Sequence, residues 1–130
     1  MSTQPPQTPI AVDALEPTVY RVTPDGSTDH DTWRKTIVDV DTDHPVFYVR
    51  IAPNAATPVH WHPSDTVYIV RRGELRVPGE ETYREGDVRW VRAGTVYGPE
   101  AAGPEGCEFY WISCGPFGSY DPDVDPPPAR

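Results

Sequence analysis

The sequence predicts an all-β protein, a small sandwich or barrel of antiparallel strands. Short runs rich in β-branched and aromatic residues recur along most of the chain, and glycines and prolines separate them. No window shows a convincing helical period, and 17 prolines among 130 residues leave little room for one. A chain of this length is expected to form one domain around a single core.

The expected strands follow one another through the central part of the chain. They span residues 19–22, 33–40, 46–52, 59–62, 66–71, 74–77, 82–84, 88–91 and 107–113. Turn residues close each run, among them Pro53-Asn54, Gly73 and Gly103-Pro104. This even spacing of strands and turns is the basis of the fold-class prediction.

The composition of the two ends differs from that of the centre. Residues 1–17 are rich in Pro, Thr and Gln, and we expect a flexible or loosely docked arm there. Residues 119–130 form a tail rich in Pro and Asp, and its prolines cannot pair in a sheet. The folded domain is therefore predicted to cover residues 18–118.

The chain is acidic, with 20 Asp and Glu against 11 Lys and Arg, a formal net charge of −9 and a pI near 4.7. This charge argues against nucleic acid or an anionic membrane as a partner. No apolar run approaches the ~20 residues that a membrane span requires. The first residues show no basic region followed by an apolar core, so a secretory signal is not expected. We therefore expect a cytoplasmic protein.

The most informative motif is Pro58-Val59-His60-Trp61-His62-Pro63. If this segment is extended, His60 and His62 point to one face and Trp61 to the other. Two imidazoles that converge from one strand can begin a metal site, since histidine is the commonest metal ligand. The alternatives are a pair that is hydrogen-bonded inside the fold, or acid–base groups that work near neutral pH.

Two motifs resemble those of the cupin superfamily, and the resemblance covers roughly residues 33–114. The first motif of that family has an H-x-H pair, a glutamate and a strand that ends in glycine; here His60, His62 and Gly73 match it. The second motif is matched by residues 86–98, which begin Gly86-Asp87 and contain Gly94. The resemblance implies a small antiparallel β-barrel of two facing sheets (a double-stranded β-helix or jelly roll), usually dimeric, with the site inside its mouth.

The sequence departs from the family at two of the positions that matter for metal binding. Cupins usually hold a divalent metal with three histidines and a glutamate, but Thr66 stands at the glutamate position and Tyr97 at the third histidine position. A threonine hydroxyl is a poor metal ligand, whereas a tyrosine can bind Fe(III) as the phenolate. Packing roles are the alternatives for both residues.

Two carboxylates are candidates for the missing ligand. Asp65 could complete a site of two histidines and one carboxylate if the loop after His62 turns it inward; otherwise it is a solvated loop residue. Glu108 could do so if the last strand turns it inward, and Tyr110 would then line the cavity too; otherwise Glu108 lies at the surface.

Two residues after Thr66 are expected to line the same cavity. Tyr68 and Val70 share its face if no bulge intervenes in the strand. The resemblance together with these positions predicts a cavity that is partly aromatic.

The leading functional hypothesis is a metal-dependent enzyme with Fe, Mn or Zn on His60 and His62. It would act on a small carbonyl or phenolic compound as a dioxygenase, isomerase or lyase. One alternative is a metal-free enzyme with an imidazole as base and Tyr97 as acid, and another is a non-catalytic module that binds a metabolite. The fold does not choose among them, and a homodimer is expected in each case.

Overall fold

The computed structural model describes residues 7, 9–19 and 31–128, and the regular secondary structure within them is almost entirely β-strand. A short 3₁₀ turn, η1 (Val12–Ala14), comes first. The strands are β1 (Thr18–Val19), β2 (Trp33–Val38), β3 (Val46–Ile51), β4 (Ala56–Thr57), β5 (Thr66–Arg76), β6 (Val88–Val91) and β7 (Glu100–Ser113). The prediction of an all-β antiparallel fold is confirmed. Within the described ranges, no helix has the length and apolar character needed to cross a membrane.

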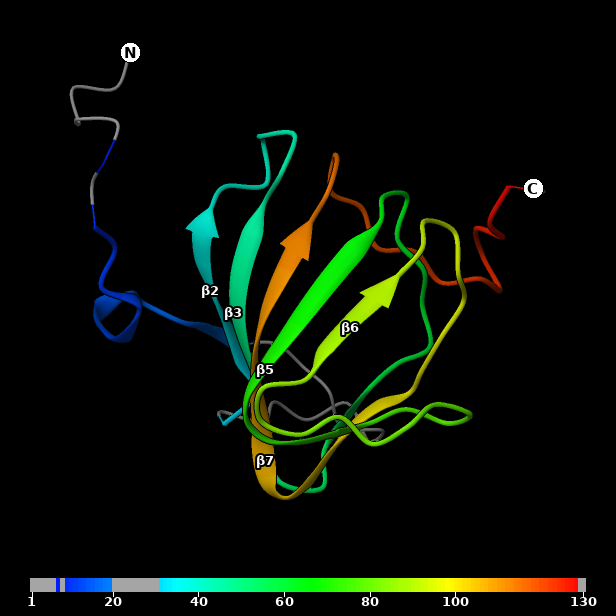
Figure 1. The fold of residues 1–130 in the computed structure, drawn as a ribbon. Helices are drawn as coiled ribbons and strands as arrows, with labels where there is room; N and C mark the ends of the chain where they lie inside the picture. The colour runs from blue at the N-terminus through cyan, green and yellow to red at the C-terminus, as the bar shows by residue number, and fades with distance from the viewer. Residues whose placement is uncertain (1–6, 8, 20–30, 129–130) are drawn as a thin grey trace.

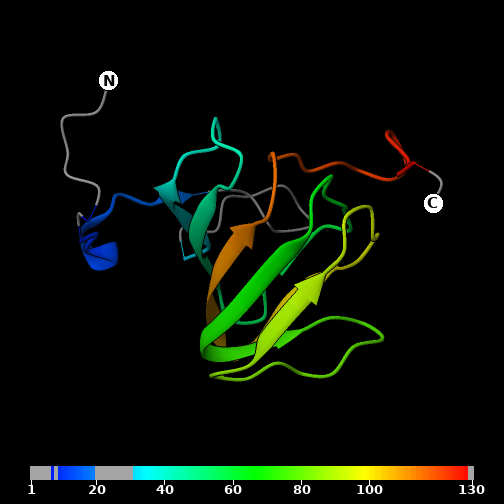
Figure 2. The same ribbon diagram turned by 45° about the horizontal axis from the view of Figure 1, so that its top comes forward.

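All pairings between these strands are antiparallel. The sheet order is β1-β2-β3-β7-β5-β6, and β4 pairs with the beginning of β7. Figure 1 shows β2, β3, β7, β5 and β6 side by side, and Figure 2 shows the same layer with its top turned forward. An isolated bridge between His60 and Tyr97 continues the pairing beyond the named strands. The motif with the two histidines is therefore fixed to the segment that leads into β7.

Alternation along β3 and β7 separates a core face from an outer face. Phe47, Val49 and Ile51 are buried in the core, and the register sets Phe47 opposite Trp111 on β7. Tyr48 lies between these residues in the sequence and therefore faces the other side of the sheet. The core face is the one that carries the cavity described below.

A turn was predicted at Gly73, but the strand continues through this residue. The predicted strands 66–71 and 74–77 are one strand, β5, with register shifts between Val70 and Arg72 and between Gly73 and Leu75. Gly73 has φ 71°, and a Cβ there would lie 1.9 Å from the carbonyl oxygen of Gly106. Only glycine fits this bulge, in which two backbones approach closely.

Three further boundaries differ from the prediction. β7 begins at Glu100 and runs through Gly103-Pro104, where a turn was expected. Residues 59–62 form only isolated bridges instead of a strand, and the same is true of Tyr83 in the predicted strand 82–84. Of the predicted strand 19–22, residues 20–22 lie outside the described residues. His60 and Trp61 pair with Tyr97 and Tyr120, which are distant in the sequence, so local composition did not reveal these pairings.

Both terminal segments contact the domain where the structure describes them. The Lys35 ammonium on β2 donates hydrogen bonds to the carbonyls of Val12 (3.1 Å) and Asp13 (3.3 Å) in η1. At the other end, Tyr120 forms an isolated bridge with Trp61, and the Trp61 indole N–H donates to the carbonyl of Asp125 at 2.6 Å. The tail is thereby docked on the segment that carries the two histidines.

Candidate functional site

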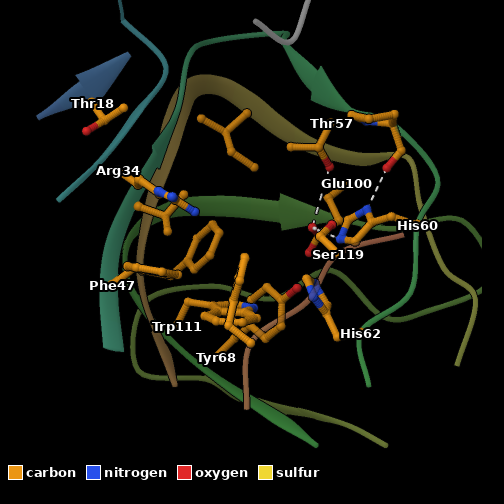
Figure 3. Close-up of a pocket in the computed structure, with 15 residues that line it drawn as sticks. Thr18, Arg34, Phe47, Thr57, His60, His62, Tyr68, Glu100, Trp111 and Ser119 are labelled. Carbon is orange, nitrogen blue, oxygen red and sulfur yellow. Dashed lines mark hydrogen bonds and ion pairs between the residues drawn. The ribbon is translucent and has the colours of Figure 1, made fainter. Parts of the chain in front are cut away.

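A cavity of about 420 Å³ opens on the core face of the sheet. Most of its lining is apolar and aromatic. Its polar side chains include His60 and Glu100 on one side and Arg34 and Thr18 on the other (Figure 3). The lining residues are Thr18, Arg34, Phe47, Val49, Ile51, Thr57, Pro58, His60, His62, Tyr68, Glu100, Phe109, Trp111, Phe117 and Ser119. A cavity of this size and character suits a small organic molecule.

His60 and His62 both line this cavity, with their ring centroids 4.8 Å apart. Backbone hydrogen bonds hold both histidines in place. His60 and Tyr97 exchange two of them, and the amide of Gly94 donates to the His62 carbonyl. Trp61 points the other way and packs against Tyr120, with ring centroids 4.7 Å apart. The alternation in the H-x-H motif therefore brings the two imidazoles to one site.

A backbone carbonyl accepts a hydrogen bond from the Nδ1 of each imidazole. Nδ1 of His60 lies 2.7 Å from the carbonyl of Pro58, and Nδ1 of His62 is bonded to the carbonyl of Gly118. Because a carbonyl can only accept, Nδ1 carries the hydrogen in both rings. In the neutral rings, the acceptor lone pair is therefore on Nε2.

The two Nε2 atoms have different surroundings. Nε2 of His60 lies 3.1 Å from the hydroxyl of Tyr97. Nε2 of His62 has no hydrogen-bond partner among the described residues, and the ring lines the cavity. Burial lowers the pKa of His62 to about 4, the hydrogen bond to Gly118 opposes this, and the nearby His60 adds to the lowering. His62 is thus a neutral imidazole at pH 7 with an uncommitted lone pair beside the cavity.

Tyr97 packs against His60, with ring centroids 4.6 Å apart, and is not among the residues that line the cavity, where a lining residue or an acid was expected. Its hydroxyl is 2.7 Å from the hydroxyl of Tyr68. Since Nε2 of neutral His60 can only accept, Tyr97 donates to His60 and Tyr68 donates to Tyr97. Burial raises the pKa of both phenols well above 10, so both stay protonated.

Glu100 is a buried carboxylate that the sequence did not reveal as a site residue. It lies beside His60 and lines the same cavity. Its side chain is 5% exposed, and its Oε1 lies 3.7 Å from Nε2 of His60 (Figure 3). Thr57 donates to the same oxygen at 3.4 Å, and Arg89 donates to Oε2 at 3.0 Å. Sequence alternation offered a signal, because Arg89 shares a strand face with the apolar Val91 and needs a buried partner there.

Arg89 itself is almost fully buried, with its side chain 1% exposed. It pairs with both Glu100 (3.0 Å) and Glu80 (2.7 Å), and its guanidinium lies over the rings of Tyr68 and Tyr97. Two carboxylates therefore neutralise one buried cation, and Arg89 fixes Glu100 beside His60.

The other carboxylates predicted as ligands lie elsewhere. Asp65 accepts hydrogen bonds from the amide of Ala93 (2.7 Å) and the indole of Trp90 (3.2 Å), and it does not line the cavity. Glu108 is on the outer face, where it accepts from Tyr48 (2.8 Å) and Arg50 (3.2 Å). Alternation along β7 decides this, because Phe109 faces the cavity and its neighbours face away.

Three further predicted positions take structural roles or lie apart from the site. Tyr110 packs against Tyr48 on the outer face, which corrects its expected place in the cavity. Val70 is buried in the core but is not a lining residue, whereas Tyr68 lines the cavity as predicted. Thr66 is fully buried, and its hydroxyl has no hydrogen-bond partner among the described residues.

The residues present do not form the metal centre that the resemblance implies. The described ranges contain no group of three or more His, Cys, Asp or Glu side chains placed to hold one ion. Nε2 of His60 already accepts from Tyr97, a phenol with a raised pKa, and Arg89 offsets the charge of Glu100. The Thr66 hydroxyl at the family's glutamate position is outside the cavity lining. Of the two imidazoles, only His62 has an Nε2 without a hydrogen-bond partner among the described residues.

Solved structures with a similar fold include several from bacteria. They include a candidate acetylacetone dioxygenase from Methylibium petroleiphilum PM1 (TM-score 0.70, 16% identity, 99% of this chain and 90% of that chain). The polyketide cyclase RemF from Streptomyces resistomycificus matches with TM-score 0.68 and 20% identity over 92% of this chain and 89% of that chain. An acetylacetone dioxygenase from Acinetobacter johnsonii matches with TM-score 0.66 and 16% identity over 95% and 83%. At these identities the likeness shows the fold alone.

The search of curated proteins found no match to this sequence. The model of the cupin domain family matches residues 47–113, which include both histidines, β5, β6 and β7. This stretch contains the two motifs that carry the resemblance in the sequence. The chain belongs to the cupin domain family.

Proposed function

We propose that this cupin is an enzyme that transfers protons on a small carbonyl or phenolic compound, without a metal centre of the usual cupin kind. The observation that carries the proposal is the different state of the two imidazoles. His62 presents a bare Nε2 to the cavity, whereas His60 lies 3.7 Å from a buried carboxylate. A base needs a free lone pair, and an acid needs a partner that offsets the charge it carries when protonated, so these surroundings assign His62 as the base and His60 as the acid.

His62 is the base in this proposal. Its Nε2 accepts a proton from a substrate carbon next to a carbonyl, or from a phenol, and the C–H or O–H electron pair stays on the substrate. The ring is held by Gly118, so its lone pair is oriented before the substrate binds. Phe109 and Trp111 form an apolar wall of the cavity, and the Trp111 ring lies 5.0 Å from the His62 ring between centroids.

His60 is the acid in the same step. When it is protonated, Nε2 carries a hydrogen that it can donate to the oxygen of a carbonyl substrate, and loss of the neighbouring C–H proton to His62 then gives the enol. Oε1 of Glu100 at 3.7 Å offsets the charge of the imidazolium. Tyr97 acts through His60, because its hydroxyl contacts Nε2 from behind the cavity wall. Return of the proton to another atom would complete an isomerisation, a cyclisation or an elimination.

Carbonyl compounds are also suggested by the relatives in structure. One is named a polyketide cyclase, and two are named for dioxygenase activity on acetylacetone, a 1,3-diketone. These names support the carbonyl class for this chain and do not choose its reaction.

The test is deuterium exchange at the carbon next to the carbonyl, followed by NMR in D₂O with a panel of hydroxyaryl ketones. We expect the wild-type protein to accelerate exchange with and without a chelator. His62→Gln and His60→Gln should each reduce the acceleration by roughly 100-fold or more, the range that removal of a general acid or base produces. His44→Gln, at an exposed histidine outside the cavity lining, is the matched control and should leave the rate unchanged.

Elemental analysis of the same samples separates this proposal from the metal-dependent enzyme predicted from the sequence. Near-stoichiometric Fe, Mn or Zn that is lost in the His60→Ala/His62→Ala variant, together with activity that a chelator abolishes, would overturn the metal-independent step. A cavity that binds ligands with no exchange would favour the non-catalytic module. The homodimer and the cytoplasmic location stay predictions, the former open to sedimentation velocity.

A further inference from the structure

The cavity carries a second polar group, Arg34, away from the histidines. In Figure 3, Arg34 lies beside Thr18 and Phe47 on the opposite side of the cavity from His60 and Glu100. Arg34 is on β2 opposite Val49, and both residues line the cavity. Its neighbours Trp33 and Lys35 contact each other on the outer face, so strand alternation turns Arg34 inward.

Arg34 differs from the arginines that serve the fold. No carboxylate within the described residues forms an ion pair or a hydrogen bond with it, whereas Arg50, Arg76, Arg84 and Arg89 each pair with at least one. The Arg34 guanidinium instead lies over Phe47, with its Cζ 4.4 Å from the ring centroid, and 5.7 Å from the centroid of Phe117. Stacking on an aromatic face leaves the N–H edges of the fork available to a ligand.

An arginine that faces an apolar cavity without a carboxylate has lost part of its hydration without gaining a partner charge. The cation–π contact offsets only part of this cost. A planar carboxylate on the ligand would supply the missing charge and match the guanidinium with two parallel hydrogen bonds. The aromatic residues Phe47, Trp111 and Phe117 line the same cavity as Arg34 and His62 and contact one another in ring pairs.

We propose that the substrate is an aromatic carboxylic acid that also bears a hydroxyl or carbonyl group. Its carboxylate binds Arg34, its ring packs among Phe47, Trp111 and Phe117, and its hydroxyl or carbonyl reaches His60 and His62. The volume of about 420 Å³ accommodates such a molecule. This inference rests on the proposed function only in taking the histidine end as the place of reaction.

The test measures binding, so its outcome does not depend on turnover. The probes are 4-hydroxybenzoate, 4-hydroxyphenylacetate and 3-(4-hydroxyphenyl)propanoate, each beside its primary amide, and the readout is calorimetry with quenching of tryptophan fluorescence. We expect the best-fitting acid to bind wild-type protein at least tenfold more tightly than its amide, a difference of about 1.4 kcal/mol, because a hydrogen bond to a charged group is stronger than one to a neutral group.

Arg34→Gln should bring acid and amide to within about twofold of each other while the affinity for the amide is retained. Arg34→Lys should keep part of the preference, because a lysine keeps the charge but not the fork. Arg72→Gln makes the same change of net charge at an exposed β5 residue outside the cavity lining and should behave as wild type.

Three results would overturn the inference: equal affinity of wild-type protein for acid and amide, a preference that survives in Arg34→Gln, or binding of every acid weaker than about 1 mM. Failure of the proposed function would look different. Acids would then bind with the Arg34-dependent preference, but no variant or wild-type protein would accelerate deuterium exchange.

Discussion

The two ends of the cavity each have an arginine, and the two arginines are held in opposite ways. At the histidine end, Arg89 is 1% exposed and is paired with Glu80 and Glu100. At the other end, Arg34 lines the cavity over Phe47 and has no carboxylate partner among the described residues. A cation that the fold has neutralised serves the structure, whereas a cation that the fold leaves unneutralised is available to a ligand. The comparison assigns Arg89 to stability and Arg34 to recognition.

The largest expected effect tests whether Arg89 stabilises the fold and Arg34 does not. Arg89→Leu leaves Glu80 and Glu100 without their partner, and loss of one member of a buried ion pair costs about 3–5 kcal/mol. Arg34→Leu should change the free energy of unfolding by at most about 1 kcal/mol, because it removes a cation–π contact and no ion pair. Urea unfolding of the two variants measures both values. Equal costs at the two positions would show that the arginines do not differ in the way proposed.

The next effect concerns the pH dependence of stability at the histidine end. The pKa of His62 is lowered to about 4 in the folded protein, against about 6.5 in the unfolded chain. The unfolded chain therefore binds the proton first as the pH falls, and the stability that His62 contributes above pH 6.5 is lost between about pH 6.5 and 4. The size of this loss is about 3 kcal/mol.

Urea unfolding at several pH values checks this expectation. His62→Gln removes the titrating ring, so its stability should vary less across the same interval. The paired carboxylates Glu80 and Asp31 have lowered pKa values and lose their contributions in more acidic solution. An equally steep loss in wild type and His62→Gln above pH 5 would contradict the buried neutral imidazole.

Strand alternation predicted one part of the site from the sequence. His60 and His62 face the cavity and Trp61 faces away, because the segment is extended even though it forms only isolated bridges. Tyr68 also faces the cavity as predicted. The period of two depends on extended backbone alone and needs no knowledge of the pairing partner.

The rest of the site depends on contacts between residues distant in the sequence. Glu100 acquires its role from Arg89 and His60, and the Gly118 carbonyl that orients His62 is 56 positions away from it. Gly73 shows a different limit, because a glycine with positive φ fits a turn and a bulge alike. Only the close approach of Gly106 decides between them.

The smallest effect tests whether the hydroxyls behind His60 form one connected chain. Tyr97→Phe removes the central hydroxyl and leaves that of Tyr68 buried without an acceptor, at a cost of about 1–3 kcal/mol. Tyr68→Phe removes the hydroxyl that donates to Tyr97. The variant with both substitutions contains neither hydroxyl, so none is left without a partner. Because the two groups bond each other at 2.7 Å, the double variant should be destabilised by less than the sum of the single variants. Additive costs in urea unfolding would show that the hydroxyls do not interact. Deuterium exchange in Tyr97→Phe should slow without being abolished, because Tyr97 reaches the cavity only through His60.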